Sequence, residues 1–135
     1  MTSRLDRLAS LLDKLDDTYA PLVTFKKFVQ SFPGNLCIYD REYMGLAFSE
    51  EFCKTLGYSE NYLMDDRWQE LVHPEELEVT TEASKKMKQV RVEDFRNRWK
   101  RADGEYVTLS WKTGPWIDLG DGKEYTICVA EVIDD

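Results

Sequence analysis

Alternating hydrophobic and polar residues mark the C-terminal third of the chain. From Phe95 to Trp111, two runs of period-two alternation flank the pair Asp103-Gly104, and such alternation predicts half-buried strands. Asp-Gly suits a type I′ turn, because both central residues of that turn need a positive φ. A third alternating run, residues 123–133, follows a glycine-rich turn at residues 120–122. The pattern therefore predicts a three-stranded antiparallel meander.

A heptad pattern opens the chain. Apolar side chains recur every three or four residues at Leu5, Leu8, Leu12, Leu15 and Tyr19, which is the a/d seam of a coiled coil. A proline at position 21 interrupts the pattern, so we expect one helix to end near residues 17–19 and a second to span about 20–31. The seam is either a homodimer interface or a stripe that folds back onto its own domain. We favour the dimer, although barely two heptads are marginal alone.

The middle of the chain predicts two short strands followed by helices. The strands are expected at residues 36–40 and 43–48. Ser49 is the predicted N-cap of a helix that ends at Gly57, because serine accepts backbone N–H groups and glycine adopts a positive φ. Short helical segments are expected at residues 59–64 and 65–71. A longer helix begins at Pro74 or Glu75 and runs to about Gln89.

Composition narrows the class of protein. The 135 residues suit one domain, and no apolar run approaches the ~20 residues of a membrane span. A net charge of −8 argues against nucleic acid as a partner, because binding phosphates needs a basic surface. The three cysteines, Cys37, Cys53 and Cys128, form no zinc or disulfide-motif spacing. We interpret them as reduced, mostly buried thiols of a cytoplasmic protein.

Four stretches together resemble the PAS family. Residues 48–59 resemble the segment that enters the first internal helix of a PAS domain, and residues 68–76 resemble its "LVHPED" stretch. Residues 95–111 are similar to its central hairpin and residues 125–135 to its last strand; one departure is Ser49, where many PAS domains have asparagine. The resemblance implies an α+β fold, with a five-stranded antiparallel sheet and short helices on one face. It divides the chain into an N-terminal helical segment, residues 1–31, and a PAS-like domain, residues 32–135.

The resemblance also sets expectations for cofactors. PAS domains sense small ligands, redox state or light, and they couple dimers to output domains. A haem-binding PAS domain usually carries a histidine on the long helix, whereas residues 75–89 contain none. Flavin photoreceptors of the light-oxygen-voltage type need a cysteine in an Asn-Cys-Arg-Phe-like motif after the short helices, and that motif is absent. We therefore expect neither haem nor flavin.

The candidate site residues are mostly aromatic. Trp68, Trp99 and Trp111, with Phe52 and Met64, are candidate lining for a small-ligand pocket, since such pockets are apolar with few polar groups. Trp116 is a further candidate, and ordinary core packing is the alternative for the whole set. His73, the single histidine, is expected to shape the loop before the long helix. No nucleophile–base arrangement or metal-ligand cluster stands out, so we expect no enzyme and no metal site.

The sequence thus favours a non-catalytic regulatory sensor domain that dimerises and couples a small-ligand or partner signal to an output. The alternative is a ligand-free protein–protein interaction module that docks through its sheet face and N-terminal helix. A signalling partner or effector is expected in either case. Both faces of the last strand are apolar, so both should be covered, one by the short helices and the other by the N-terminal helices or a partner.

Overall fold

The computed structural model describes residues 19–133 and contains the predicted antiparallel sheet. Five strands run in the order β2-β1-β6-β4-β3. A sixth strand, which the sequence did not indicate, has only two residues and pairs with β6. The strands are β1 (Asn35–Asp40), β2 (Gly45–Phe48), β3 (Phe95–Lys100), β4 (Tyr106–Thr113), β5 (Ile117–Asp118) and β6 (Glu124–Ile133).

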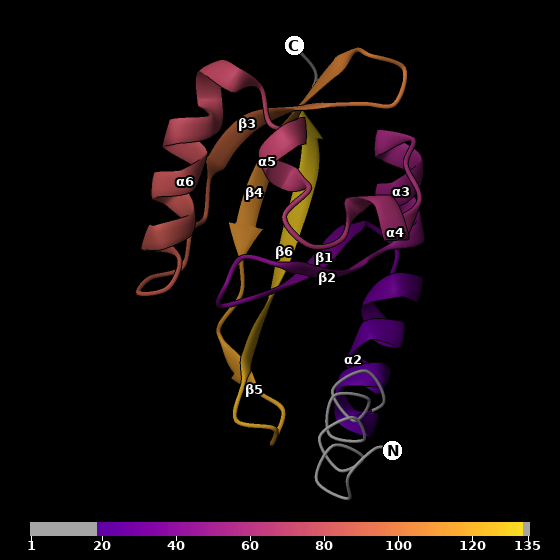
Figure 1. Cartoon of the computed structure of the whole chain (residues 1–135), viewed down its shortest axis with the longest axis vertical. Helices are drawn as coiled ribbons and strands as arrows, with labels where there is room; N and C mark the ends of the chain where they lie inside the picture. Colours follow the sequence, from indigo (N-terminus) through magenta and orange to yellow (C-terminus); the bar gives the residue numbers. More distant parts are fainter. Residues whose placement is uncertain (1–18, 134–135) are drawn as a thin grey trace, which may run out of the picture.

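The helices lie where the pattern placed them, with shifted ends. The long helix is shorter than expected, because a 3-10 turn replaces its first turn and it ends three residues before Gln89. Figure 1 shows α6 alongside β3 and β4, and α2 at the opposite end of the molecule. The helices are α2 (Ala20–Ser31), α3 (Glu50–Leu56), α4 (Glu60–Leu63), α5 (Trp68–Leu71), the 3-10 turn η1 (Pro74–Glu76) and α6 (Leu77–Lys86).

The two faces of the sheet pack against different helices. We call inner face the side that carries Cys37, Tyr39, Trp99 and Trp111, which form one core with α3, α4 and α5. We call outer face the side that carries Leu36, Ile38 and Tyr125, which form a second core with α2. Alternate residues of β1 thus enter different cores, as the two-residue period of a strand requires.

Ser49 links the start of α3 to the start of β1. Its hydroxyl accepts the backbone N–H of Phe52 at 3.2 Å and donates to the carbonyl of Gly34 at 2.6 Å. It is completely buried, so the predicted N-cap also ties α3 to the start of β1. Gly57 ends α3 with a φ of +84°, the predicted left-handed C-cap.

The turn between β1 and β2 differs from the prediction. β2 begins at Gly45 rather than Tyr43, because Tyr43 has a φ of +61° and cannot continue a strand. The Asp40 carboxylate holds this turn by accepting the N–H groups of Glu42 and Met44 at 2.9 and 3.0 Å. The left-handed backbone directs the Tyr43 side chain away from the strand alternation and towards the inner face.

The turn of the β3–β4 hairpin is also not the one predicted. Gly104 has the expected positive φ of +89°, but Asp103 does not, which rules out a type I′ turn. Instead, Arg101 and Glu105 pair across a three-residue loop, and Gly104 donates its N–H to the carbonyl of Arg101 at 3.0 Å. The Asp103 carboxylate stabilises this loop by accepting the N–H of Glu105 at 2.9 Å.

Carboxylates cap both edges of the sheet. At the β2 edge, Glu60 accepts the N–H of Phe48 at 3.0 Å, and at the β3 edge Glu76 accepts the N–H of Arg98 at 2.8 Å. Isolated bridges, Gly45 with Asp65 and Val72 with Trp99, take up further edge groups. An added strand would have to displace these partners, so the edges are poor docking sites for an extended peptide.

The leucines of the N-terminal seam, Leu5, Leu8, Leu12 and Leu15, lie outside the described residues. Tyr19 is described, and its hydroxyl donates to the carbonyl of Leu119 at 2.8 Å. The predicted start of the second helix at Ala20-Pro21 is confirmed, because α2 begins at Ala20 after Tyr19, whose ψ of 116° is not helical. Within residues 19–133, none of the helices combines the length and apolar character that crossing a bilayer requires.

Candidate functional site

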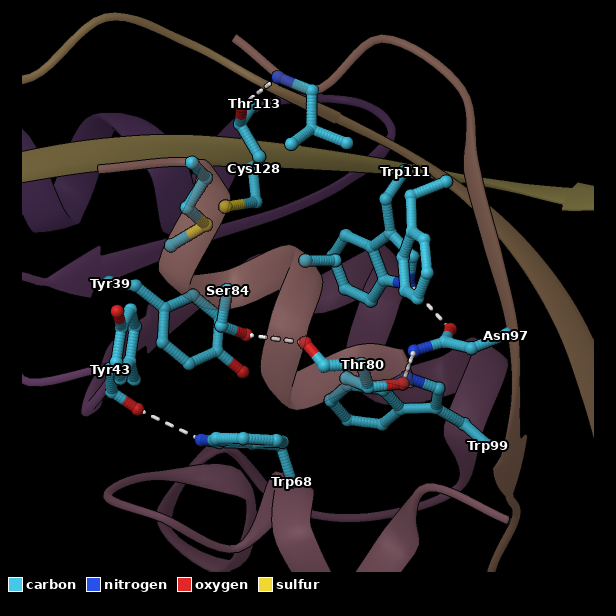
Figure 2. A pocket seen from close by; sticks show the side chains of 14 residues that line it. Tyr39, Tyr43, Trp68, Thr80, Ser84, Asn97, Trp99, Trp111, Thr113 and Cys128 are labelled. Carbon is cyan, nitrogen blue, oxygen red and sulfur yellow. Dashed lines mark hydrogen bonds between the residues drawn. The ribbon is translucent and has the colours of Figure 1, made fainter. Parts of the chain in front are cut away.

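A cavity of about 70 Å³ lies between the inner face of the sheet and α6. Figure 2 shows its lining, to which β1, β3, β4, β6 and α6 all contribute. The volume corresponds to roughly two water molecules at about 30 Å³ each. It is well below the roughly 300–1,000 Å³ of pockets for drug-sized ligands. The cavity as it stands therefore fits a molecule of a few non-hydrogen atoms, and haem or flavin would require its walls to move.

Three of the five candidate residues meet at this cavity. Trp68, Trp99 and Trp111 all line it. Phe52 lies behind them, with its ring centroid 6.2 Å from that of Trp99 and 5.7 Å from that of Trp111. Met64 packs against the same core without lining the cavity. The candidate residues therefore cluster as a group, with two of them serving as support.

Trp116 lies outside the lining. Its indole N–H donates to the carbonyl of Met87 at 2.9 Å, where Met87 forms part of the cavity wall just after α6. The guanidinium of Arg41 lies over the Trp116 ring at 4.7 Å from its centroid. Trp116 therefore fixes the end of α6 from outside.

A buried polar network crosses the cavity wall at Asn97. Its side-chain oxygen accepts the indole N–H of Trp111 at 2.8 Å, and its amide nitrogen donates to the hydroxyl of Thr80 at 3.2 Å. Because an indole N–H is only a donor, this network fixes which side of the Asn97 amide carries oxygen. Asn97 and Thr80 are both buried, so the network joins β3, β4 and α6 away from water.

Two aromatic residues of the cavity wall are more than nine-tenths buried and carry a donor without a partner among the described residues. The indole nitrogen of Trp99 is buried without an acceptor. The hydroxyl of Tyr39, a residue that is only 7% exposed, makes no hydrogen bond within residues 19–133. Burial raises the pKa of the Tyr39 phenol well above its usual value, so it keeps its proton and remains a donor. Leaving a buried donor unpaired costs on the order of 1–3 kcal/mol.

Among residues 19–133, no charged side chain lines the cavity. The ammonium of Lys88 lies over the ring of the lining residue Tyr43, at 4.7 Å from its centroid. Burial raises the pKa of Cys37, and this thiol donates weakly to the carbonyl of Cys128 at 3.8 Å. The wall therefore has no group suited to general acid–base catalysis near neutral pH.

The remaining predicted residues have structural positions. His73 accepts the N–H of Glu75 on Nδ1 at 3.1 Å and so caps η1, which confirms its expected role in the loop before α6. Cys37 and Cys128 lie in strands and Cys53 lies in α3, as expected. No cluster of three metal-binding side chains occurs among the residues that the structure describes.

Sequence reasoning missed Tyr39, Thr80, Ser84 and Asn97 as lining residues. Asn97 carried a usable signal, because it occupies the apolar phase of β3 between Phe95 and Trp99. A polar residue in a buried phase usually has a partner there. The other three carried none, since tyrosine, threonine and serine are ordinary residues of strands and helices.

A shallow groove crosses the outer face of β3, β4 and β6 beyond the end of α2. Val129 on its floor is 42% exposed, and Ile127 and Ile133 are half-buried. Charged side chains of both signs surround these residues, among them Arg96, Lys112 and Glu131. Within residues 19–133, α2 covers the outer face of β6 near Tyr125, and Val129 stays exposed.

Three solved structures that share this architecture are distant in sequence. The Rhodobacter sphaeroides LOV protein is 13% identical with a TM-score of 0.71, covering 84% of this chain and 68% of its own. Drosophila melanogaster Cycle PAS-B, solved with bound ethylene glycol, is 18% identical with a TM-score of 0.65, covering 73% and 99%. The PAS domain of an HTR-like protein from Haloarcula marismortui is 16% identical with a TM-score of 0.62, covering 93% and 99%.

The family assignment rests on the sequence as well. No curated protein matches the chain significantly. The profile of the PAS fold, however, matches residues 46–130, which is more than half of the chain. This range runs from β2 to the middle of β6 and includes the helices and strands that enclose the cavity, apart from β1. The chain therefore belongs to the PAS family, whose fold is that of a regulatory sensor domain.

Proposed function

We propose that this PAS domain is a non-catalytic sensor that binds a small molecule in the inner-face cavity. The observation that carries the proposal is the cavity itself, with aromatic walls and a few polar groups held by a rigid sheet. Cycle PAS-B, which shares the fold, was solved with ethylene glycol bound, and a molecule of that size suits a cavity of about 70 Å³. The lack of charged side chains in the wall supports a binding role over a catalytic one.

A signal from the cavity has a short route to the chain ends. Cys128 on β6 lines the cavity, whereas its neighbours Ile127 and Val129 face the outer side. β6 also pairs with both β1 and β4, so a shift of this strand reaches most of the sheet. We infer that ligand occupancy moves β6 against α2 and thereby alters the contacts of the N-terminal segment with an effector.

Native mass spectrometry of the purified full chain tests the sensor proposal. We expect a non-covalent small molecule that is released on denaturation. Ala83→Leu puts a larger side chain into the cavity wall and should abolish the bound species. Ala20→Leu, at an exposed position of α2, is the matched control and should retain it. A parent chain that shows only its bare mass and releases nothing contradicts the proposal.

Assembly as a homodimer through the N-terminal seam is the second part of the proposal. Its support is the heptad spacing of Leu5, Leu8, Leu12 and Leu15. The seam residue Tyr19 is anchored to its own domain through Leu119, so a dimer contact there would reach the β5 end of the sheet directly. The domain is further proposed to act in the cytoplasm, and the free thiols of Cys37 and Cys128, paired residues of β1 and β6, support a reducing compartment.

Light scattering coupled to gel filtration tests the dimer. We expect the parent chain to have twice the mass of one chain, and Leu8→Asp combined with Leu12→Asp to have the mass of one chain, since charges at a/d positions oppose burial. Ser10→Asp, outside the seam, is the control and should leave the dimer intact. A parent chain that elutes as a monomer at high micromolar concentration contradicts the dimer.

A ligand-free docking module is the alternative function, and the exposed groove on the outer face favours it. There Val129 stands among charges of both signs, which is the composition of an interface rim around an apolar centre. The two functions separate through a pair of variants. If docking is the function, Val129→Asp abolishes the effect of the domain on its effector, and Ala83→Leu leaves that effect unchanged. The sensor proposal predicts the reverse.

The proposed domain carries no haem or flavin. The long helix has no histidine, and the lining cysteine, Cys128, lies on β6 rather than after the short helices. An absorption band at about 400–450 nm that follows the protein through gel filtration would overturn this part of the proposal.

A further inference from the structure

The cavity wall offers hydrogen-bond donors that residues 19–133 leave unused. We propose that Tyr39 and Trp99 recognise the ligand, and that the ligand is a small uncharged molecule with an oxygen acceptor such as a carbonyl or hydroxyl group. This inference rests on the proposed sensor function and specifies the chemistry of its site.

Tyr39 is the better placed of the two donors. It occupies β1 opposite Thr126 of β6, and Figure 2 shows its hydroxyl pointing into the cavity. The residue is more than nine-tenths buried, since only 7% of it is exposed, and the hydroxyl has no partner within the described part of the chain. A phenol kept neutral by burial donates one hydrogen bond, which an acceptor entering the cavity would satisfy.

Trp99 supplies the second donor, on the same inner face but from β3 at the edge of the sheet. It lies on β3, two residues from Asn97, so both side chains point to the inner face. The Asn97 amide is already engaged with Trp111 and Thr80, whereas the N–H of Trp99, a residue only 3% exposed, is unpaired within residues 19–133. Strands β6 and β4 separate β1 from β3, which places the two donors at opposite ends of the cavity.

The charge of the wall determines the charge of the ligand. Both unused groups are donors, so they complement an acceptor. A carboxylate or phosphate would also accept these bonds, but no lysine, arginine or histidine lines the cavity to balance its charge. Burying an unpaired charge is far more costly than burying a hydrogen-bonded neutral group. An uncharged oxygen acceptor is therefore the chemistry that the wall fits.

Three probes of the same shape separate these possibilities: acetone, isobutene and acetate. Acetone has a neutral oxygen acceptor, isobutene has none, and acetate carries a charge. Each is titrated into isotopically labelled full-length protein, and binding is followed by the amide signals of Thr80, Ser84 and Cys128, which line the cavity. The signal of the Trp99 indole N–H reports directly whether an acceptor reaches that donor.

We expect acetone to bind more tightly than isobutene, and acetate not to bind. Tyr39→Phe removes only the hydroxyl and should reduce the preference for acetone over isobutene roughly three- to tenfold, the value of one hydrogen bond. The same variant should unfold no more easily than the parent, because it deletes a hydroxyl that has no partner among the described residues. The control is Tyr58→Phe. The Tyr58 hydroxyl donates to the carbonyl of Lys100 away from the cavity, so this variant should keep the preference for acetone over isobutene.

The outcomes distinguish this inference from the function on which it rests. If isobutene binds as tightly as acetone, or if Tyr39→Phe and Trp99→Phe both keep the parent's preference, the inference is wrong and the cavity remains a ligand site. If acetate binds best, the ligand is an anion and the inference is wrong. If no probe moves the signals of Thr80, Ser84 and Cys128, the cavity is no ligand site and the sensor function fails with it.

Discussion

The inner and outer faces of the sheet differ in the burial and hydrogen bonding of their polar side chains. On the inner face, Asn97 is buried and hydrogen-bonded to Trp111 and Thr80. On the outer face of the same β3–β4 pair, Arg96 and Ser110 are register partners that both contact the Asp94 carboxylate near water. The inner network joins β3, β4 and α6, whereas the outer contacts join only β3, β4 and the residue before β3.

This difference shows which face specifies the fold and which remains free for contacts. Buried polar networks are favourable only when all members are satisfied, so they hold one arrangement of the surrounding elements. The unpaired donors, Tyr39 and Trp99, lie in the same cavity wall as this network. Exposed pairs contribute little to stability, and the outer face therefore tolerates change. The predictions below test this contrast.

The largest effect is expected from Phe52→Ala. Phe52 is fully buried and its ring contacts those of Phe48, Trp99 and Trp111, so its loss should lower the free energy of unfolding by about 3–5 kcal/mol. Val129→Ala on the outer face should cost below about 1 kcal/mol. Urea denaturation measures both. Similar costs for the two variants would mean that the inner face is not the dominant core.

The next largest loss of stability is expected from Asn97→Ala. It removes the acceptor of the Trp111 indole N–H and the donor to Thr80, so we expect a loss of about 2–3 kcal/mol. Ser110→Ala, on the neighbouring strand but facing outwards, is the matched control and should change the free energy of unfolding by less than about 0.5 kcal/mol. Equal denaturation midpoints for both variants would remove the distinction between buried and exposed polar groups.

Gly104→Val tests the hairpin that places Asn97 and Trp111 on the same face. A Cβ atom added at Gly104 would meet no other atom within 4 Å, so the substitution acts only through its φ of +89°. A β-branched residue there should cost about 1–2 kcal/mol. Gly104→Asn should cost less, because asparagine tolerates a left-handed backbone. Denaturant titration compares the two variants, and an unchanged midpoint for the valine variant would show that this turn does not hold the hairpin.

The smallest effect concerns the outer-face carboxylate of Asp94. Hydrogen bonds from Ser110 and then Arg96 lower the pKa of Asp94 below its ordinary value of 3.8. A lowered pKa in the folded state means that this contribution is present above the unfolded pKa and is lost as the pH falls through the folded pKa. Ser110→Ala should therefore reduce stability at pH 7 slightly and flatten its decline below about pH 4. Thermal melts across about pH 2–7 measure this, and identical profiles would contradict it.

The sequence was sufficient to predict the helices and strands, but not the turns or the residues that line the cavity. Period-two alternation placed β3, β4 and β6, and Ser49 and Gly57 marked both ends of α3. Both turn predictions were wrong. Tyr43 adopts a positive φ that no residue preference indicates, and the Asp103 carboxylate favours a three-residue loop. Local side-chain hydrogen bonds decided both turns.

The site was only partly predictable for a related reason. The aromatic content singled out Trp68, Trp99 and Trp111, which do line the cavity. Tyr39 and Thr80 come from β1 and α6, and they reach the same wall only through the strand order, which puts β1 beside β6. Lining residues of this kind follow from tertiary packing, so a single sequence carries no local signal for them.

Xenon binding tests the central claim, that the inner face holds a ligand site and the outer face does not. Dry apolar cavities take up xenon. Under xenon pressure, the methyl signals of Met87 and Ala83, which line the cavity, should shift and saturate. Those of Val129 and Ile133 on the outer groove should shift only weakly and without saturation. Saturable shifts confined to Val129 and Ile133, or none at any of the four residues, would contradict the account.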